Sequence, residues 1–176
     1  MSLVESILSA NDGRAVAQIA KQVGIPESVA KKGIEALAPS LQRGLQRNTK
    51  KRGGAEGLLD ALKSGSHARY VDDPATLEKE DSIADGNKIL GHIFGNKDVS
   101  RNVAGEASGR SGIDSALLKK MLPMLGAVAM GAMAKNASGG SSGGSPLDAL
   151  GGLLGGSGGG EDSSLDSILD LGKKFF

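Results

Sequence analysis

A run of fourteen residues without a charge or a hydrogen-bonding side chain, from Met121 to Ala134, constrains the fold of this chain more than any other feature. A helix that is apolar on every side must be buried, either in a protein core or in a membrane. At about 1.5 Å per residue the run spans ~21 Å, which is shorter than the ~30 Å hydrocarbon layer of a bilayer. Lys120 and Lys135 close the run at its two ends. We therefore predict a central core helix, with a short membrane or interface insertion as the alternative.

Apolar residues recur three and four positions apart through most of the preceding sequence, which is the pattern of amphipathic helices. Further helices are predicted over residues 3–10, 13–23, 26–47, 57–62, 82–94 and 99–108. Ser2, Asp12 and Asp114 precede three of the predicted helices and carry side chains that cap helix N-termini. Pro39 lies inside the helix over 26–47 and should kink it, because proline removes a backbone donor.

The segment from residue 64 to residue 73 is predicted to be a loop. Asp73-Pro74 is a helix-start signal, but the residues that follow, up to Asp81, are too polar to be buried. The helix over 82–94 is expected to bury one face, formed by Ile83, Ile89, Leu90, Ile93 and Phe94.

The sequence contains an internal repeat. The segments Gly24–Lys32 and Gly112–Lys120 both open with Gly-Ile and both close with Lys-Lys, without a gap. Each runs into a helix that contains a proline, Pro39 in the first copy and Pro123 in the second. We therefore predict an all-α fold, a helical bundle of two related units, each made of a helix, a glycine turn and a proline-kinked helix. A glycine-rich flexible C-terminal tail follows the bundle.

Composition limits how the core is built. The chain has no cysteine, so disulfides, thiolate chemistry and cysteine-ligated metals are excluded. Its aromatic residues are Tyr70, Phe94, Phe175 and Phe176, too few for a stacking platform that binds single-stranded nucleic acid. An aliphatic core lets helices approach closely. Close approaches are predicted at Gly33, Gly44, Ala127 and Gly131.

Charge alternates along the chain. The net charge is +5 over residues 1–55, −4 over 56–98, +3 over 99–135 and −3 over 136–176. The total is only +1, so no global field attracts nucleic acid or an anionic membrane. The alternation favours contacts between oppositely charged segments, within one molecule or between molecules.

The composition changes after residue 135, and three parts are predicted: a helical domain over 1–135, a linker over 136–162 and a short amphipathic helix over 163–176. Residues 139–160 contain eleven glycines in twenty-two positions, which is typical of a flexible linker. The last part is expected to dock as a helix in an apolar groove, in the same molecule or between subunits. Its apolar residues are the predicted partner-binding residues: Leu165, Ile168, Leu169, Phe175 and Phe176.

The titratable residues form no known catalytic or metal-binding pattern. His67 and His92 are far apart, and His92 has no carboxylate one turn away, so a zinc site is not indicated. The acidic residues between Asp72 and Asp85 lack the spacing of a calcium-binding loop and are expected to be solvated. A nucleophile elbow and a phosphate-binding glycine loop are also missing from the sequence. The sequence thus predicts no enzyme activity, no cofactor and no metal.

A nucleic-acid-binding function is the runner-up hypothesis. The glycine turn at Gly24 followed by a helix resembles a helix-turn-helix motif. Ala30 and Gly33, however, occupy positions where a recognition helix normally buries branched apolar residues. Packing is therefore the favoured role of the turn. The candidate phosphate contacts are Lys31, Lys32, Arg43 and Arg47.

Several stretches resemble one bacterial family, known as domain of unknown function 937, with the YidB-like proteins as relatives. They are residues 19–25 (IAKQVGI), 37–39 (LAP), 86–95 (GNKILGHIFG), 111–113 (SGI) and 121–125 (MLPML), followed by the leucine- and glycine-rich tail. The GHIFG stretch is the most specific, and the resemblance covers roughly residues 3–135. It implies an all-helical fold and a bacterial source, and it implies no activity.

The function that the sequence favours is that of a non-enzymatic interaction or structural protein, which self-associates or docks a protein partner. A nucleic-acid-binding module is the alternative, and peripheral membrane association through the C-terminal helix is the third hypothesis. The first residues lack the basic and continuous apolar regions of a signal peptide, so a cytoplasmic location is expected.

Overall fold

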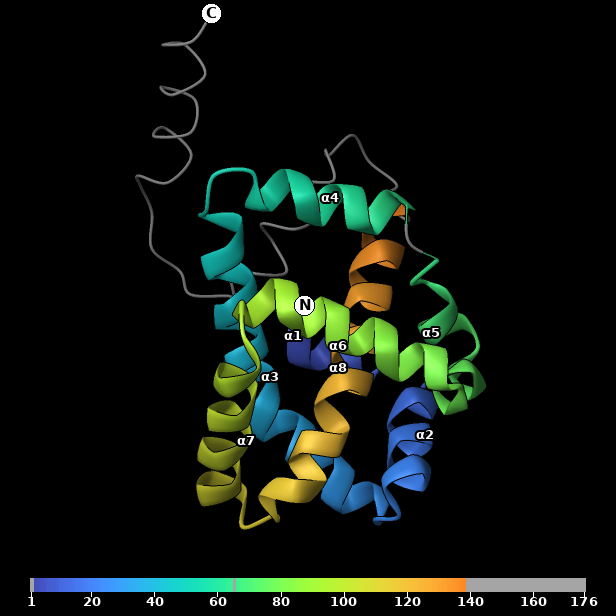
Figure 1. Ribbon diagram of the computed structural model, residues 1–176. Helices are drawn as coiled ribbons and strands as arrows, with labels where there is room; N and C mark the ends of the chain where they lie inside the picture. Colours follow the sequence, from blue (N-terminus) through green and yellow to red (C-terminus); the bar gives the residue numbers. More distant parts are fainter. Residues whose placement is uncertain (1, 65, 139–176) are drawn as a thin grey trace, which may run out of the picture.

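A computed structural model of the chain describes residues 2–64 and 66–138 (Figure 1). All regular elements in these residues are helical, which confirms the predicted all-α fold. In chain order the elements are α1 Leu3–Leu8, α2 Arg14–Val23, α3 Glu27–Thr49, α4 Gly54–Ser64, α5 Arg69–Asp72, the 3₁₀ helix η1 Pro74–Glu78, α6 Glu80–Phe94, α7 Lys97–Ser111 and α8 Ser115–Ser138.

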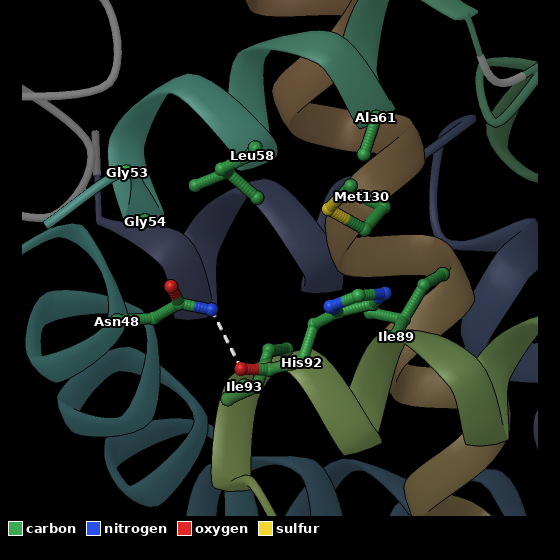
Figure 2. Close-up of a pocket in the computed structure, with 10 residues that line it drawn as sticks. Asn48, Gly53, Gly54, Leu58, Ala61, Ile89, His92, Ile93 and Met130 are labelled. Atoms are coloured by element: carbon green, nitrogen blue, oxygen red, sulfur yellow. Dashed lines mark hydrogen bonds between the residues drawn. The ribbon is translucent and has the colours of Figure 1, made fainter. Parts of the chain in front are cut away.

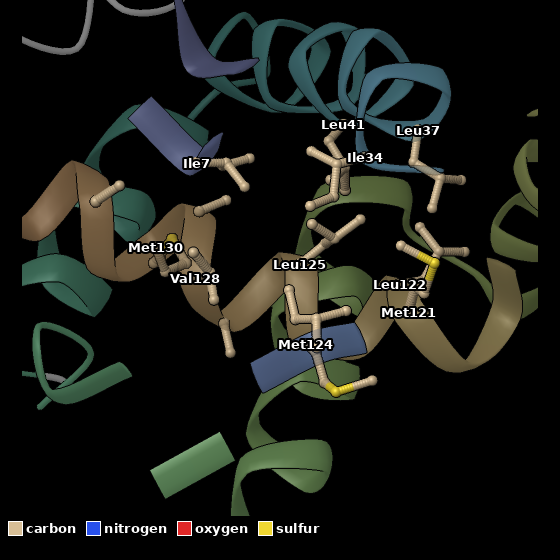
Figure 3. Close-up of a cluster of buried hydrophobic side chains, with 14 of the residues drawn as sticks. Ile7, Ile34, Leu37, Leu41, Met121, Leu122, Met124, Leu125, Val128 and Met130 are labelled. Atoms are coloured by element: carbon tan, nitrogen blue, oxygen red, sulfur yellow. The ribbon is translucent and has the colours of Figure 1, made fainter. Parts of the chain in front are cut away.

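Helix α8 forms the buried axis of the domain. Figure 1 shows it running through the middle of the helices, with α6 crossing it, α3 and α7 on one side and α2 on the other. All fourteen residues of the range 121–134 are buried. Figure 3 shows Leu125 pointing toward Ile34 and Leu41 of α3, and Leu122 pointing toward Leu37. The predicted central core helix is therefore confirmed, and α8 continues to Ser138, past the expected domain boundary.

The membrane alternative for this helix has less support. By length and apolarity, residues Ser115–Asn136 meet the requirements of a membrane span, with a mean hydropathy of 1.3. Within the described domain, however, 78% of the apolar window is buried by other parts of the chain. A core helix of a folded domain passes the same length and composition test, and this burial favours that interpretation.

The contact between α6 and α8 is the most extensive of any helix pair in the described residues. It is close because glycines lie at the crossing point. A Cβ atom on Gly86 of α6 would collide with the Pro123 carbonyl group of α8, and a Cβ atom on Gly126 would lie 3.4 Å from the Gly86 oxygen. The backbones of the two helices therefore touch directly, with no side chain between them.

The three glycines among these positions are all closely packed, but only Gly33 makes its contact between the two long helices α3 and α8, where the sequence predicts them to cross. A Cβ atom on Gly33 would lie 2.8 Å from Met121 Cε, and one on Gly44 would meet Ile93 and Phe94. On Gly131 it would lie 2.6 Å from the His67 carbonyl oxygen. The fourth predicted position, Ala127, is fully buried.

The two predicted glycine turns have the same backbone conformation. Gly24 ends α2 with a φ of +77°, and Gly112 ends α7 with a φ of +71°. Both angles lie in the left-handed region, which glycine adopts without a steric penalty. Each turn leads into a long helix that contains a proline, Pro39 in α3 and Pro123 in α8.

Two of the three predicted N-caps are confirmed and the third is wrong. The Ser2 hydroxyl accepts a hydrogen bond from the Glu5 N–H, and the Asp114 carboxylate accepts one from the Ala116 N–H. Asp12 does not cap α2, because it has a left-handed backbone with a φ of 53°, and Gly13 is the N-cap. A side chain caps a helix from an extended backbone, so the left-handed turn removes Asp12 from this role.

The predicted buried face of α6 is wrong at its start. Ile83 is 41% exposed, whereas Ser82 is 1% exposed and Gly86 is buried. The backbone contact at Gly86 requires small residues on the side facing α8, which turns Ile83 toward solvent. The later positions Ile89, Leu90 and Ile93 are buried as predicted, and Phe94 is half-buried.

The segment predicted as loop and polar contains two short helices, α5 and η1, that contribute to the core. Tyr70, Val71 and Leu77 are buried. The Tyr70 hydroxyl donates to Asp85 Oδ2 at 2.7 Å, and Arg69 Nη2 pairs with the same oxygen at 3.1 Å. This segment therefore folds through tertiary contacts with α6 and α8 that its own polar sequence does not indicate.

Some of the oppositely charged segments form ion pairs with one another within the molecule. Lys21 of α2 pairs with Glu78 of η1 at 2.8 Å, and Lys135 of α8 pairs with Asp72 of α5 at 2.7 Å. Both ion pairs join a positive segment to the negative segment 56–98. The side chains are about half exposed or more, so each pair contributes little stability in water.

His67 makes the stability of the domain depend on pH. Its Nδ1 atom is buried without a hydrogen-bond partner, and its ring stacks on Tyr70. Burial lowers the pKa of His67 below its ordinary value of 6.5, with Asp85 raising it and Arg69 lowering it. The unfolded chain then binds a proton at a higher pH than the folded chain. Stability should therefore fall as the pH decreases below about 6.5.

Urea unfolding of the full chain between about pH 5 and pH 7 measures this dependence. In the variant His67→Gln, the free energy of unfolding should depend less on pH between these two values. Glu5 and Glu78 do not account for it, because hydrogen bonds from Ser2 and from Lys21 lower their pKa values below 4.5. If the free energy of unfolding changes equally with pH in the variant and in the natural chain, His67 is not the cause of the pH dependence.

Candidate partner-binding groove

Helices α3 and α7, together with the end of α6, enclose a groove of about 350 Å³ at the surface of the domain. The residues that line it are Ser40, Arg43, Gly44, Arg47, Lys51, Ile93, Phe94, Val99, Asn102, Val103 and Glu106.

The buried and half-buried side chains that line the groove are apolar, with Ser40 as the exception. Ile93 and Val103 are buried, and Phe94 and Val99 are half-buried. The local sequence explains this arrangement, because Gly95 ends α6 with a φ of +79° and turns the chain directly into α7. Asn96 then caps α7, its side chain accepting from the Asp98 and Val99 N–H groups. The hairpin of α6 and α7 thereby brings Phe94 and Val99 to the same groove.

The rim on the α3 side is basic. Arg43 and Arg47 lie one helical turn apart, and Lys51 follows just after the end of α3. All three side chains are exposed, and none belongs to a salt bridge of the described residues. The one acidic residue among those that line this groove is Glu106 of α7. The groove therefore combines an apolar floor with cations that lack an ionic partner in this part of the chain.

A second hollow, of about 460 Å³, lies between the same two helices. It is lined by Lys32, Glu35, Ala36, Arg110 and Ser111. Arg110 Nη2 donates to the Ala36 carbonyl oxygen at 3.4 Å. The α3 residues that line the two hollows run from Lys32 to Arg47, a length of ~23 Å at about 1.5 Å per residue.

The structure places three of the four candidate phosphate contacts in the two hollows and one outside them. Lys32, Arg43 and Arg47 line the two hollows, whereas Lys31 is exposed outside both of them. Helix α3 itself packs against α1, α2, α4, α6, α7 and α8. Ala30 is fully buried and Gly33 contacts Met121 of α8. The helix is thus enclosed along much of its surface, unlike a recognition helix that enters a DNA groove.

The α7 wall of the groove could not be found by reasoning from sequence. Val99, Val103 and Arg110 lie more than fifty residues from the α3 residues that they face. Their own sequence signal is a weak helical pattern, and only the tertiary contact between α3 and α7 gives them a shared role.

A separate cavity of about 160 Å³ lies under α4. Figure 2 shows Leu58 and Ala61 of α4 above it, Ile89 and His92 of α6 below it and Met130 of α8 behind it. Asn48 Nδ2 donates to the His92 carbonyl oxygen at 2.6 Å and ties α3 to α6 at its edge. The His92 side chain is exposed, as expected for a helix-surface residue. The cavity has room for one or two side chains but not for a helix.

The acidic residues between Asp72 and Asp85 are distributed over separate contacts. Asp72 pairs with Lys135, Glu78 with Lys21 and Asp85 with Arg69. Among the residues that the structure describes, no three His, Asp or Glu side chains gather as a metal site would require.

The predicted partner-binding residues of the tail lie outside the described residues. They are Leu165, Ile168, Leu169, Phe175 and Phe176. The same holds for the predicted linker from residue 139 onward.

Comparison with known proteins places this helical domain in a family. The profile of the family described as "Bacterial protein of unknown function (DUF937)" matches residues 5–136. No curated protein and no solved structure matches the chain. The matched range extends from α1 almost to the end of α8 and covers more than half of the sequence. The chain therefore belongs to the DUF937 family of bacterial proteins of unknown function.

Proposed function

We propose that this chain is a non-enzymatic interaction protein, whose helical domain binds an acidic amphipathic helix of a protein partner. The binding site is the groove between α3 and α7. The observation that supports this proposal is the apolar floor bordered by Arg43, Arg47 and Lys51, which have no salt bridge within the described residues.

An amphipathic helix fits this site for physical reasons. Such a helix lays its apolar residues on a groove floor, here Phe94 and Val99, and keeps its polar residues at the rim. Unpaired cations along one rim favour carboxylates on the incoming helix and speed its association. The length of the two hollows along α3, ~23 Å, suits a helix of about four turns.

Nucleic acid is the alternative ligand for the same cations. A phosphate backbone, however, gains nothing from the half-buried Phe94 and Val99, and the groove also carries the carboxylate of Glu106. Binding to nucleic acid would weaken steeply with salt, because each neutralised phosphate releases counterions. The apolar floor predicts binding that keeps a substantial part of its strength at high salt.

Reversing the rim charges should weaken partner binding. The partner is first isolated from source cells with the full-length chain, then purified and titrated against the variant Arg43→Glu/Arg47→Glu. We expect the dissociation constant to rise by about tenfold or more, since like charges then face the acidic helix. A calorimetric titration at two salt concentrations measures this change.

The matched control is Lys119→Glu/Lys120→Glu, which makes the same change in charge at exposed positions of α8 outside the groove. This control should bind the partner as the natural chain does. Equal affinity of the rim variant and the control would contradict the proposal. A specific, salt-sensitive shift of a DNA duplex that only the rim variant loses would also contradict it and would favour the nucleic-acid alternative.

A further inference from the structure

We infer that the groove between α3 and α7 is occupied by the chain's own carboxyl-terminal segment, residues 163–176, in the same molecule. This inference rests on the proposed function, because it uses the same groove and names the segment that occupies it when no partner is bound. It is supported by the charge pattern, the apolar pattern and the length of chain that follows α8.

The first turns of the segment carry charges opposite to those of the groove, and Lys173 and Lys174 follow near its end. Arg43 and Arg47 of α3 are four residues apart, and Lys51 continues the same spacing. In the tail, Asp162, Asp166 and Asp170 also recur every four residues. Residues four apart lie on one face of a helix, separated by about 6 Å along its axis. A helix over the tail segment therefore presents Asp166 and Asp170 at the spacing of Arg43 and Arg47 on α3, with Asp162 just before its start and Lys51 just after the end of α3.

The apolar residues of the segment match the floor. Leu165, Ile168 and Leu169 have the spacing of one helical face, which the carboxylates border on one side. Phe175 and Phe176 add two of the four aromatic side chains of the chain. The segment, at about 1.5 Å per residue, is ~21 Å long and fits within the ~23 Å length of the two hollows.

The connection is long enough for docking within one molecule. Twenty-four residues lead from Ser138, the end of α8, to Asp162. A glycine-rich chain of this length spans ~27 Å as a random coil and ~80 Å when extended. A domain of this size has a radius of gyration of only ~14 Å. A tether of this kind gives an effective concentration on the order of 1 mM, which favours the segment of the same molecule over that of a neighbour.

The cavity under α4 is a weaker candidate for the same segment. Its volume of about 160 Å³ admits a side chain rather than a helix, and among the described residues no lysine or arginine lines it. Residues of this cavity therefore serve as an internal reference in the experiment that follows.

Paramagnetic relaxation enhancement in the full-length chain tests the inference. The natural chain has no cysteine, so Ser167→Cys allows a spin label at one position in the tail. The label should broaden the amide signals of Val99, Asn102 and Val103 in the groove, and leave those of Leu58 and Ala61 in α4 less affected. The broadening should persist when the labelled, isotope-enriched chain is diluted with an excess of unlabelled natural chain.

Charge exchange gives the matched control. Arg43→Glu/Arg47→Glu should remove the broadening, and adding Asp166→Lys/Asp170→Lys to that variant should restore it. Lys119→Glu/Lys120→Glu should leave the broadening as in the natural chain. Circular dichroism and the melting temperature check that each variant remains folded.

Three results would overturn the inference. They are the absence of groove broadening, broadening only between different molecules, and broadening that is unchanged by reversal of Arg43 and Arg47. The proposed function is judged separately by the affinity of the purified partner. If the rim variant loses the partner while the label leaves the groove signals sharp, the inference fails and the proposed function stands. If neither measurement responds to rim reversal, both fail.

Discussion

Leu125→Ala is expected to lower the free energy of unfolding by ~2–5 kcal/mol. Leu125 is fully buried in the middle of α8 and points toward Ile34 and Leu41 of α3. The substitution removes apolar contacts and leaves a cavity that a close-packed core fills only partly. Because domains of this size are stable by only ~5–15 kcal/mol, this loss is a large part of the total. Urea unfolding followed by circular dichroism measures it.

The control for this substitution is Leu117→Ala in the first turns of the same helix, where the side chain is half-buried. It should destabilise the domain clearly less than Leu125→Ala. If the two variants unfold at the same urea concentration, the packing of α8 against α3 is not what stabilises the domain.

Gly86→Ala is expected to destabilise the domain by at least ~1–3 kcal/mol, the usual range for overpacking. The new Cβ atom would collide with the Pro123 carbonyl group, which belongs to the backbone and cannot rotate away. Helices α6 and α8 must then separate at their crossing point, and the most extensive helix contact in the described domain loses packing.

Gly91→Ala makes the same chemical change in the same helix, but nothing lies within 4 Å of its Cβ position. Alanine is favoured over glycine in an exposed helix by up to about 1 kcal/mol, so this variant should be more stable than the natural chain. Thermal unfolding should move in opposite directions for the two variants. A gain in stability for Gly86→Ala would show that the two backbones do not touch.

Patterns within one helix predicted much of the fold. The uncharged run in α8, the glycine turns at Gly24 and Gly112 and the caps at Ser2 and Asp114 are local features, and the sequence determines them directly. The close approaches at Gly33, Gly44 and Gly131 could also be predicted, because a glycine inside a helix costs stability and often has a packing reason, although Gly91 has none.

Features that depend on distant contacts could not be predicted. Ile83 looked buried by its periodicity, but the backbone contact at Gly86 turns it toward solvent. Leu77 lies in a polar stretch and is nevertheless fully buried. In the groove, the sequence alone indicates Arg43 and Arg47 as candidate phosphate contacts. Their neighbours Val99 and Val103 became part of the same site only through the packing of α7 on α3.

Native-state hydrogen exchange of the full-length chain tests most directly whether α8 is the buried axis around which the domain, and with it the groove, is built. The amides from Met124 to Met133 should exchange more slowly than any others and only through global unfolding. Their rates should not change when phospholipid vesicles are added. Fast exchange in this range, or protection that appears only with vesicles, would contradict a core role for α8 and favour a membrane role.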